Sequence, residues 1–281
     1  MKKITFTVDT DKPAELQSFL RGQKGVSRRL LTKLKRLESG ITCNGKPARS
    51  IDIVFPGDVI ALKCPDSGGL EPNFSLNVPA VFENENLIVF NKPAGMPVHP
   101  SIRHQGDTLG NYFSSLFPEL TFRPVNRLDR DTSGLCVIAK NALAASSLQG
   151  ECRKIYYAAV HGIIEESGTI DAPITRRQQS IITRCVSLEG RRAITHYRRL
   201  SFNEKYSLAE IVLETGRTHQ IRVHFSHIGH PLAGDDLYGG LRENISRQAL
   251  HCGNMSFTEP VSGELITVNA PLPEDIEGLF R

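Results

Sequence analysis

Hydrophobic positions along this chain fall mostly in short runs, and few stretches show helical spacing. After residue 80, six runs are typical of strands: 87–90, 135–139, 156–160, 193–200, 208–213 and 220–225. Two segments, 108–116 and 142–149, are instead typical of helices. Strands and helices do not alternate regularly, as they would in a doubly wound parallel sheet. The pattern therefore predicts an α+β domain.

The first 66 residues show a different pattern, centred on one amphipathic helix. Ser27 is a suitable N-cap for a helix that continues to Leu37. The apolar stripe of this helix is formed by leucines at helical spacing: Leu30, Leu31, Leu34 and Leu37. Turn signals at 44–45 and 56–58 separate short strands. We therefore expect a small α+β domain over residues 1–66, a Pro/Gly/Ser-rich linker over 67–79 and a larger domain over 80–281.

Charge is unevenly distributed between these parts. The 281 residues carry a net charge of +4, but residues 1–66 hold 13 Lys and Arg against 7 Asp and Glu. The remainder holds 21 against 23. Four basic residues lie on the predicted helix: Arg28, Arg29, Lys33 and Arg36. A lone basic helix face is more often only solvated, and the alternative is a surface that binds a polyanionic partner.

Composition excludes several other classes of protein. An apolar fraction of 40% with 23% charged residues is ordinary for a globular chain, and no run of 18 apolar residues predicts a membrane span. The N-terminus lacks the apolar core of a signal peptide. The six cysteines are scattered without a Cys-x-x-Cys pair. We therefore expect reduced thiols in a cytoplasmic protein.

The most informative segment is 125–141, because it contains Asp129 between two arginines. Opposite charges close by keep such a carboxylate ionised. Residues 132–134 supply turn chemistry, and the run 135–139 follows as a buried strand. A carboxylate on a sharp turn at the mouth of a sheet is a suitable nucleophile. The alternative is an aspartate that caps the turn and pairs with arginine.

Five ordered blocks, of which 127–135 is one, resemble the RluA-like pseudouridine synthases. The others are an opening segment at 81–100, a Lys-x-Tyr-x-Ala block at 154–162, a third block at 214–224 that is followed by matching Gly, Asp and Tyr residues up to position 239, and closing segments at 250–251 and 270–273. Together they span about residues 80–275. One position departs from the family: Asn126 stands where a histidine is usual, and an asparagine can keep a polar contact to the turn.

The resemblance implies a fold, a reaction and three catalytic residues. The expected fold has a mixed, largely antiparallel sheet with a central cleft, and the expected reaction isomerises uridine in structured RNA. Asp129 is expected to attack the anomeric carbon or to assist elimination to a glycal, with Arg217 as its ion-pair partner. Tyr156 is expected beside the base, although spacing alone would suit a core tyrosine. The reaction involves no redox change, so no cofactor or metal is expected.

Two further residues are expected to bind the substrate. Ile221 would form an apolar wall for the base. Arg127 would fill the space left by a flipped nucleotide, since a guanidinium plane stacks on bases. An ion pair with Asp129 or Asp131 is the alternative role for Arg127.

Residues 12–63 resemble the small RNA-binding domain first recognised in ribosomal protein S-four. A basic helix of this type would hold phosphates without reading bases. This domain pairing resembles the ribosomal members of the family, so large-subunit ribosomal RNA is the expected partner, and transfer RNA stays open. We expect a monomer.

Two rival functions are weighed against this one. A metal hydrolase would use the four histidines that lie close together in the sequence just before Asp235 and Asp236: His219, His224, His227 and His230. The spacing of five between the first two fits neither the helical i, i+4 zinc pattern nor one strand face. An RNA-binding module with an inactive catalytic half is the other rival, and the intact Asp129, Tyr156 and Arg217 argue against it.

Overall fold

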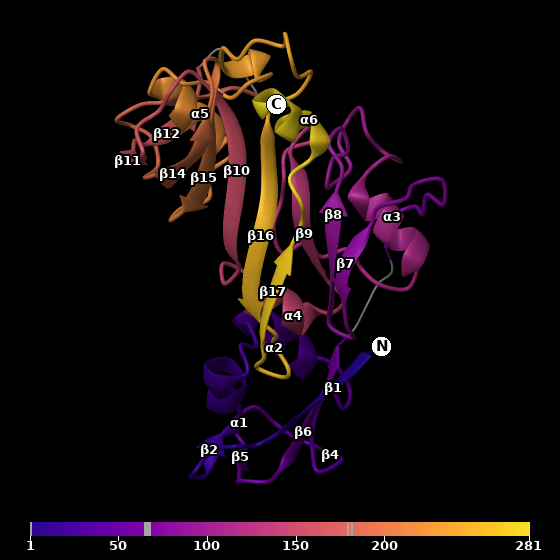
Figure 1. Ribbon diagram of the computed structural model, residues 1–281. Coiled ribbons are helices and arrows are strands. Elements are labelled where there is room, and N and C mark those ends of the chain that lie inside the picture. Colours follow the sequence, from indigo (N-terminus) through magenta and orange to yellow (C-terminus); the bar gives the residue numbers. More distant parts are fainter. Residues whose placement is uncertain (1, 65–68, 179, 181) are drawn as a thin grey trace.

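A computed structural model describes residues 2–64, 69–178, 180 and 182–281 of the chain. The predicted linker falls partly at residues 67–68, which lie outside the described residues. Figure 1 shows a small unit (residues 2–64) below a larger one (the described residues from 69 onward). Each unit has its own hydrophobic core.

The small unit is built on a four-stranded antiparallel sheet and one basic helix. The sheet order is β1 (Lys2–Thr7), β6 (Val59–Cys64), β3 (Ile41–Cys43) and β4 (Lys46–Pro47). A second pair joins β2 (Ala14–Glu15) to β5 (Ile53–Val54). The helical segments are α1 (Leu16–Ser18), the π-helix η1 (Phe19–Gln23) and α2 (Arg28–Lys35). Ser27 caps α2 as expected, because its hydroxyl accepts a hydrogen bond from the Leu30 amide at 3.2 Å.

A nine-stranded sheet forms the large unit. Its strands run in the order β11 (Ser167–Asp171), β14 (Ile194–Phe202), β15 (Tyr206–Leu213), β10 (Arg153–His161), β16 (Leu250–Thr258), β9 (Ser133–Ala139), β8 (Leu87–Lys92) and β7 (Ala80–Glu83), with β17 (Leu265–Asn269) also paired to β16. All pairs are antiparallel except β16 with β9. The expected α+β fold with a mixed, largely antiparallel sheet is therefore confirmed.

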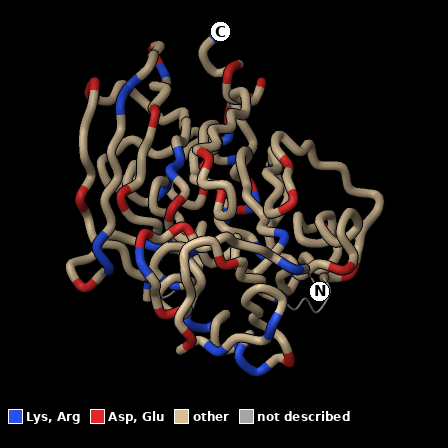
Figure 2. The backbone as a smooth tube through the Cα atoms, turned by 90° about the horizontal axis from the view of Figure 1, so that it is seen from below, with Lys and Arg blue, Asp and Glu red and all other residues tan. Residues whose placement is uncertain are grey.

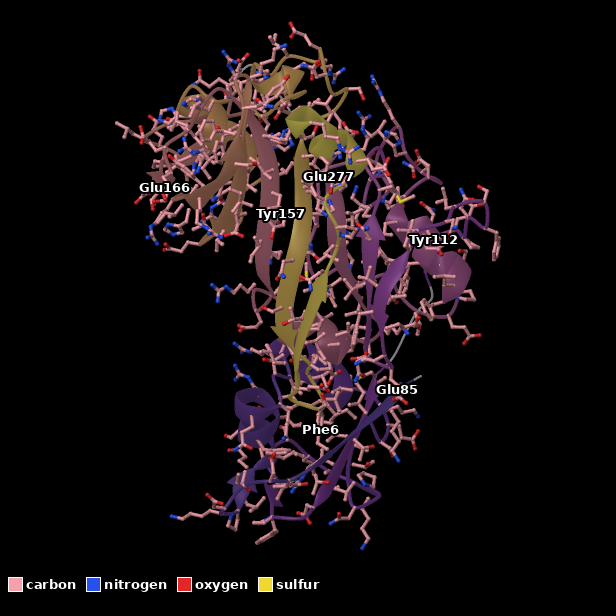
Figure 3. All side chains as sticks on the ribbon, in the orientation of Figure 1. Phe6, Glu85, Tyr112, Tyr157, Glu166 and Glu277 are labelled. Carbon is pink, nitrogen blue, oxygen red and sulfur yellow. The ribbon has the colours of Figure 1, made fainter. Side chains whose placement is uncertain are left out.

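The remaining elements lie around this sheet. They are a hairpin of β12 (Ile174–Arg176) and β13 (Arg184–Val186), and the helices α3 (Leu109–Leu116), α4 (Ala142–Ser147), α5 (Gln220–His227), η2 (Asp236–Tyr238), α6 (Glu274–Glu277) and η3 (Gly278–Phe280). Figure 3 shows Tyr157 on β10 and Tyr112 on α3. In the described part of the chain, no helix is both long and apolar enough to cross a membrane.

The strand predicted over 220–225 is wrong, because these residues form helix α5. The side chain of Gln220 starts the helix: its Oε1 accepts from the Arg217 amide at 2.9 Å and from the Thr215 hydroxyl at 3.0 Å. Six of the eight helical residues are buried. A helix buried on nearly every side shows no polar stripe, so its periodicity could not be distinguished from that of a buried strand.

The parallel pairing of β9 with β16 depends on a glycine. Gly134 has φ +110°, and a Cβ there would lie 2.2 Å from the Cys252 carbonyl oxygen. Only glycine combines that backbone conformation with so close an approach. This contact fixes the start of β9, and with it the position of the preceding turn that carries Asp129.

The two units contact each other through α4. Leu143 of α4 belongs to the hydrophobic core of the small unit, which includes Phe6, labelled in Figure 3. The hydroxyls of Ser146 and Ser147 donate to the Gly25 carbonyl at 3.3 and 3.5 Å. The small unit is therefore attached to α4 of the large unit through a mixed apolar and polar contact.

Candidate active site

Asp129 lies on the tight turn that enters β9. The Thr132 amide donates to the Asp129 carbonyl at 3.1 Å, which closes the turn. The neighbouring carboxylate, Asp131, forms two hydrogen bonds of 2.9 Å with Arg130. Burial raises the pKa of Asp131, but the bonds and charge of Arg130 outweigh it and lower that pKa overall. The two carboxylates of the turn therefore have different partners.

The turn is clamped by two basic side chains from distant parts of the sequence. Lys92, at the end of β8, donates to the Arg130 carbonyl at 3.0 Å. Arg247 donates to the Asp131 carbonyl at 3.1 Å and forms a bidentate pair with Asp275. These contacts hold two successive carbonyls of the turn, so the carboxylate of Asp129 is carried by a rigid support.

The Asp129 carboxylate is paired with helix α5. Its Oδ2 accepts from Arg222 at 3.0 Å, and His219 Nε2 lies 3.6 Å from the same oxygen. Arg222 also forms a bidentate pair with Asp235, with bonds of 2.7 and 2.8 Å. The Asp235 side chain is 1% exposed and that of Asp129 is 29% exposed. One guanidinium therefore holds a buried structural carboxylate and a partly accessible one.

The expected ion pair between Arg217 and Asp129 is not present. Arg217 is exposed, and its Nε donates to the Arg192 carbonyl at 3.0 Å. The guanidinium that pairs with Asp129 is Arg222, five residues further on. Arg222 lies in the first turn of α5, and His219, the residue before this helix, approaches the same carboxylate oxygen. Arg217 was expected from the family resemblance, and the pairing of Arg222 depends on where α5 lies in the fold.

Tyr156 lies on β10, buried beside Cys252 of β16. Burial is the main cause that raises the pKa of Tyr156 well above its usual value, and the nearby charge of Asp129 acts in the same direction. The phenol therefore keeps its proton at neutral pH.

The other predicted substrate-binding residues have contrasting environments. Ile221 is 4% exposed and belongs to the core of the large unit. Arg127 is exposed, and among the described residues no ion pair joins it to Asp129 or Asp131. Asn126 is buried and bridges to β9: its amide donates to the Leu135 carbonyl, and its oxygen accepts from the Val137 amide.

Lys92 was part of a recognised sequence block, but its role was not predicted. The side chain is fully buried, and its ammonium donates to three carbonyls, those of Pro93, Met96 and Arg130, at 2.8 to 3.0 Å. Burial lowers the pKa of Lys92 to about 8, against the opposing charges of Asp131 and Asp129. Among the residues that the structure describes, no carboxylate is bonded directly to this ammonium; burying such a group is costly, which points to a specific need for it.

The histidines of the third block do not converge. His224 is buried and bonded through both nitrogens, to the Thr195 hydroxyl and the Ala172 carbonyl, each at 2.9 Å. Within the described ranges, no group of three or more His, Cys, Asp or Glu side chains could hold a metal ion. No disulfide joins any of the six cysteines.

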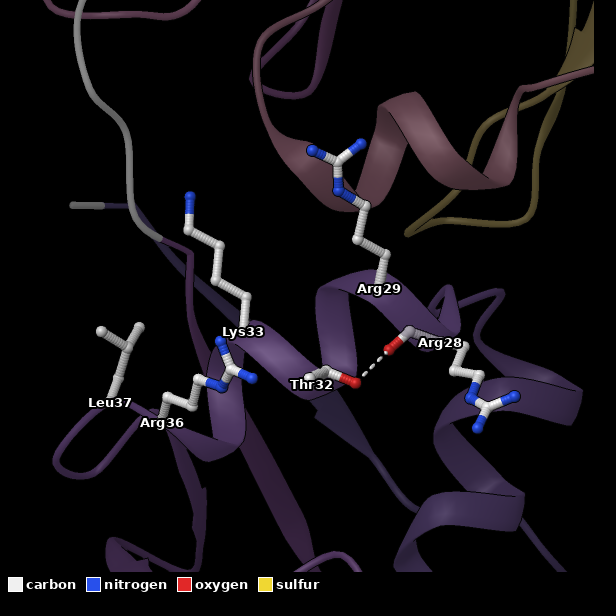
Figure 4. Close-up of a pocket in the computed structure, with 6 residues that line it drawn as sticks. All are labelled: Arg28, Arg29, Thr32, Lys33, Arg36 and Leu37. Carbon is white, nitrogen blue, oxygen red and sulfur yellow. Dashed lines mark hydrogen bonds between the residues drawn. The ribbon is translucent and has the colours of Figure 1, made fainter.

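A basic surface lies on the small unit. The four basic side chains predicted on α2 are exposed and, with Thr32 and Leu37, line a hollow of about 610 Å³. Figure 4 shows Arg28 at one end of this group and Lys33 and Arg36 at the other. A second hollow, on the side of Gln17, is lined by Arg21 and Lys35. Figure 2 marks the Lys and Arg positions along the whole backbone.

A comparison with protein families identifies the family of this chain. The profile described as RNA pseudouridylate synthase matches residues 86–227, which include the Asp129 turn, Tyr156 and Arg222. The chain belongs to the RNA pseudouridylate synthase family. It is therefore an RNA pseudouridine synthase, an isomerase that modifies RNA.

Similar proteins support this membership over almost the full length of the synthase. The uncharacterized RNA pseudouridine synthase YjbO of Bacillus subtilis is 38% identical over 272 residues, which cover 92% of this chain and 96% of that protein. Ribosomal large subunit pseudouridine synthase D of Pseudomonas aeruginosa is 38% identical over 260 residues, covering 84% of this chain and 81% of that protein.

Solved structures agree on the fold. Human RNA Pseudouridylate Synthase Domain Containing 1 is 29% identical with a TM-score of 0.60, covering 72% of this chain and 86% of that chain. Human RNA Pseudouridylate Synthase Domain Containing 4 has a TM-score of 0.56 at 23% identity, covering 70% of this chain and 90% of that chain, and this shows the fold alone.

Proposed function

We propose that this synthase uses Asp129 to isomerise uridines of large-subunit ribosomal RNA in the cytoplasm, with no cofactor, and that it acts as a monomer. The observation that carries the catalytic part is the pairing of Asp129. Its Oδ2 is occupied by Arg222, while among the described residues Oδ1 has no hydrogen-bond partner. The guanidinium pairs with the carboxylate and orients it, and the second oxygen can act on the substrate.

The chemistry requires an anion and little else. The bond from C1′ of the ribose to N1 of uracil breaks, the base rotates, and a bond from C1′ to C5 forms. C5 loses a proton and N1 gains one, so electrons and atoms balance without an oxidant or reductant. Asp129 either attacks C1′ or removes the C2′ proton to give a glycal, and the partly accessible carboxylate suits both routes.

Other residues would receive the flipped nucleotide. Tyr156 is suited to lie against the uracil ring, since its neutral phenol presents a flat, uncharged surface. Ile221 would provide an apolar wall from the first turn of α5. Arg127 is exposed and two residues before Asp129, so its guanidinium can stack in the gap that the extruded base leaves. Arg217, which lies exposed before α5, would then contact RNA and not the catalytic carboxylate.

The small unit would bind the RNA backbone. We assign residues 1–66 to the S-four type of RNA-binding domain, followed by a linker over 67–79 and the catalytic domain over 80–281. The exposed basic side chains of α2 and the two hollows beside it support this assignment. Flexible guanidinium and ammonium groups in an open hollow neutralise phosphates without reading the sequence.

The choice of ribosomal RNA is supported by the names of similar proteins. Three of them, from Pseudomonas, Xanthomonas and Neisseria, are called ribosomal large subunit pseudouridine synthase D and are 36 to 38% identical to this chain.

A pseudouridine map of total RNA tests both parts of the proposal. Cells lacking the gene should lose specific pseudouridines in large-subunit ribosomal RNA, and the wild-type protein should restore them. Asp129→Asn should fail to restore them, and Asp131→Asn, its matched control on the same turn, should succeed. If the lost sites lie in transfer RNA, the substrate assignment is wrong while the catalytic one survives. Restoration by Asp129→Asn would refute the catalytic assignment.

A further inference from the structure

His219 lies at the active site in an unusual backbone conformation. It precedes α5 as the N-cap residue with φ 58° and ψ 20°, a left-handed geometry that costs free energy for a residue other than glycine. Its side chain is 12% exposed and places Nε2 3.6 Å from Asp129 Oδ2. Strain at a non-glycine residue beside a reactive carboxylate suggests that the position of this imidazole matters for function.

The hydrogen bonds around His219 determine which nitrogen carries its proton. The Arg184 amide donates to the hydroxyl oxygen of Tyr238 at 3.0 Å. A phenol oxygen that already accepts one hydrogen bond favours donating its own proton, here to His219 Nδ1, which lies 2.8 Å away. An Nδ1 that accepts a hydrogen bond leaves the proton of neutral imidazole on Nε2, the nitrogen that faces Asp129.

The surroundings keep both partners in the required protonation states. Burial raises the pKa of Tyr238, so its hydroxyl retains the proton that it donates. Burial also lowers the pKa of His219, and Arg222 and Arg184 act in the same direction against the charges of Asp129 and Asp235. The Tyr238 ring is held in place by the Arg222 guanidinium, 5.0 Å from its centroid.

We propose that His219 is a positioning residue: its Nε2–H, selected by Tyr238, acts with Arg222 on Oδ2 of Asp129 and leaves Oδ1 for the ribose. The inference rests on the proposed function of Asp129. Arg222 is hydrogen-bonded to Oδ2 at 3.0 Å, and the Nε2–H of His219, 3.6 Å from the same oxygen, attracts it electrostatically. Together the two groups favour one orientation of the carboxylate and leave Oδ1 for the reaction. His219 itself does not touch the substrate in this scheme.

A matched pair of variants separates the donor from the shape of the side chain. His219→Gln places an amide N–H near the position of Nε2, whereas His219→Leu has similar bulk and no donor; both side chains meet the same left-handed backbone. With enzyme in excess over an RNA that contains the target uridine, we expect His219→Leu to form pseudouridine at least tenfold more slowly than wild type. His219→Gln should be several-fold faster than His219→Leu, with RNA affinity unchanged in both. Equal rates for the two variants, whether both slow or both normal, would overturn the proposal.

Tyr238→Phe gives an independent readout, which also serves if a His219 variant does not fold. It keeps the aromatic ring over Arg222 and removes only the hydroxyl. The ¹⁵N shifts of His219 should show the Nε2–H tautomer in the wild type and an increased share of Nδ1–H in Tyr238→Phe, with a reduced single-turnover rate. A wild-type enzyme in the Nδ1–H tautomer would contradict the proposal. An active Asp129→Asn enzyme would instead refute the proposed function, so the two failures are distinguishable.

Discussion

Replacing Arg222 by methionine should destabilise the protein strongly, because two carboxylates depend on this one guanidinium. Its side chain is 8% exposed, and its pair with Asp235 is buried at 1% exposure. Methionine fills much of the same volume but leaves the Asp235 carboxylate buried without a counter-charge. Breaking a buried ion pair in this way costs about 3 to 5 kcal/mol of folding free energy.

The expected loss is large enough to measure by thermal unfolding. For a protein of this size, each kcal/mol lowers the melting temperature by about 2 to 4 °C, so Arg222→Met should melt about 6 to 20 °C below wild type. The matched control is Arg217→Met. Arg217 is exposed and makes one hydrogen bond to a backbone carbonyl, so its loss should change stability by about 0.5 kcal/mol or less.

A double variant identifies the cause of the loss. Asp235→Asn removes the negative charge that Arg222→Met leaves unpaired, so the double variant should be more stable than the sum of the two single effects predicts. Equal melting temperatures for Arg222→Met and Arg217→Met would refute the assignment of Arg222 as the buried partner. Strict additivity in the double variant would refute the role given to the buried charge.

Three further predictions concern pH and salt. Above about pH 8 the buried Lys92 becomes neutral and has two protons for three carbonyls, so the single-turnover rate should fall. Because the pKa of Lys92 is lower in the folded than in the unfolded protein, its contribution to stability should rise between pH 8 and 10.5. A loss of folded protein in parallel with the loss of rate would contradict this prediction. Burial lowers the pKa of His251 to about 4, so the unfolded state binds more protons than the folded state between pH 6.5 and 4, and up to about 3 kcal/mol of stability should be lost on acidification. His251→Asn should flatten the dependence of melting temperature on pH over this range, and an unchanged slope would exclude the effect. Changing Arg29, Lys33 and Arg36 together to Gln should weaken RNA binding and reduce the slope of log affinity against log salt concentration by about 2, without changing the reaction rate at saturating enzyme. An unchanged salt slope would exclude phosphate contacts by these three side chains.

The sequence predicted much of the fold and part of the site. Ser27 as a cap, the buried strand after Asp129 and the helix after Thr108 depend on local patterns, and the structure confirms them. The turn itself was predictable because its residues are contiguous. Local signals of this kind require no knowledge of which segments meet in space.

The contacts of the site depend on tertiary structure, which local patterns do not contain. Helix α5 is buried on most sides, so its apolar pattern is ambiguous, and residues 220–225 were predicted to form a strand. The ion pair with Asp129 was expected at Arg217 from the family resemblance, whereas Arg222 forms it. The roles of Lys92 and Tyr238 could not be predicted either. Each acts on a segment more than 15 residues away, the Asp129 turn for Lys92 and His219 for Tyr238, and nothing in their own neighbourhood indicates the partner.

Single-turnover formation of pseudouridine by Asp129→Asn tests the central claim most directly. The substitution keeps the size of the side chain and one oxygen but removes the anion. The assay follows tritium release from RNA labelled at carbon 5 of uridine, with enzyme in excess. A folded Asp129→Asn protein that binds RNA normally should release no tritium above background, while Asp131→Asn should remain active. Substantial release by Asp129→Asn would contradict the account, and an active Asp129→Asn beside an inactive Asp131→Asn would assign the reaction to the other carboxylate of the turn.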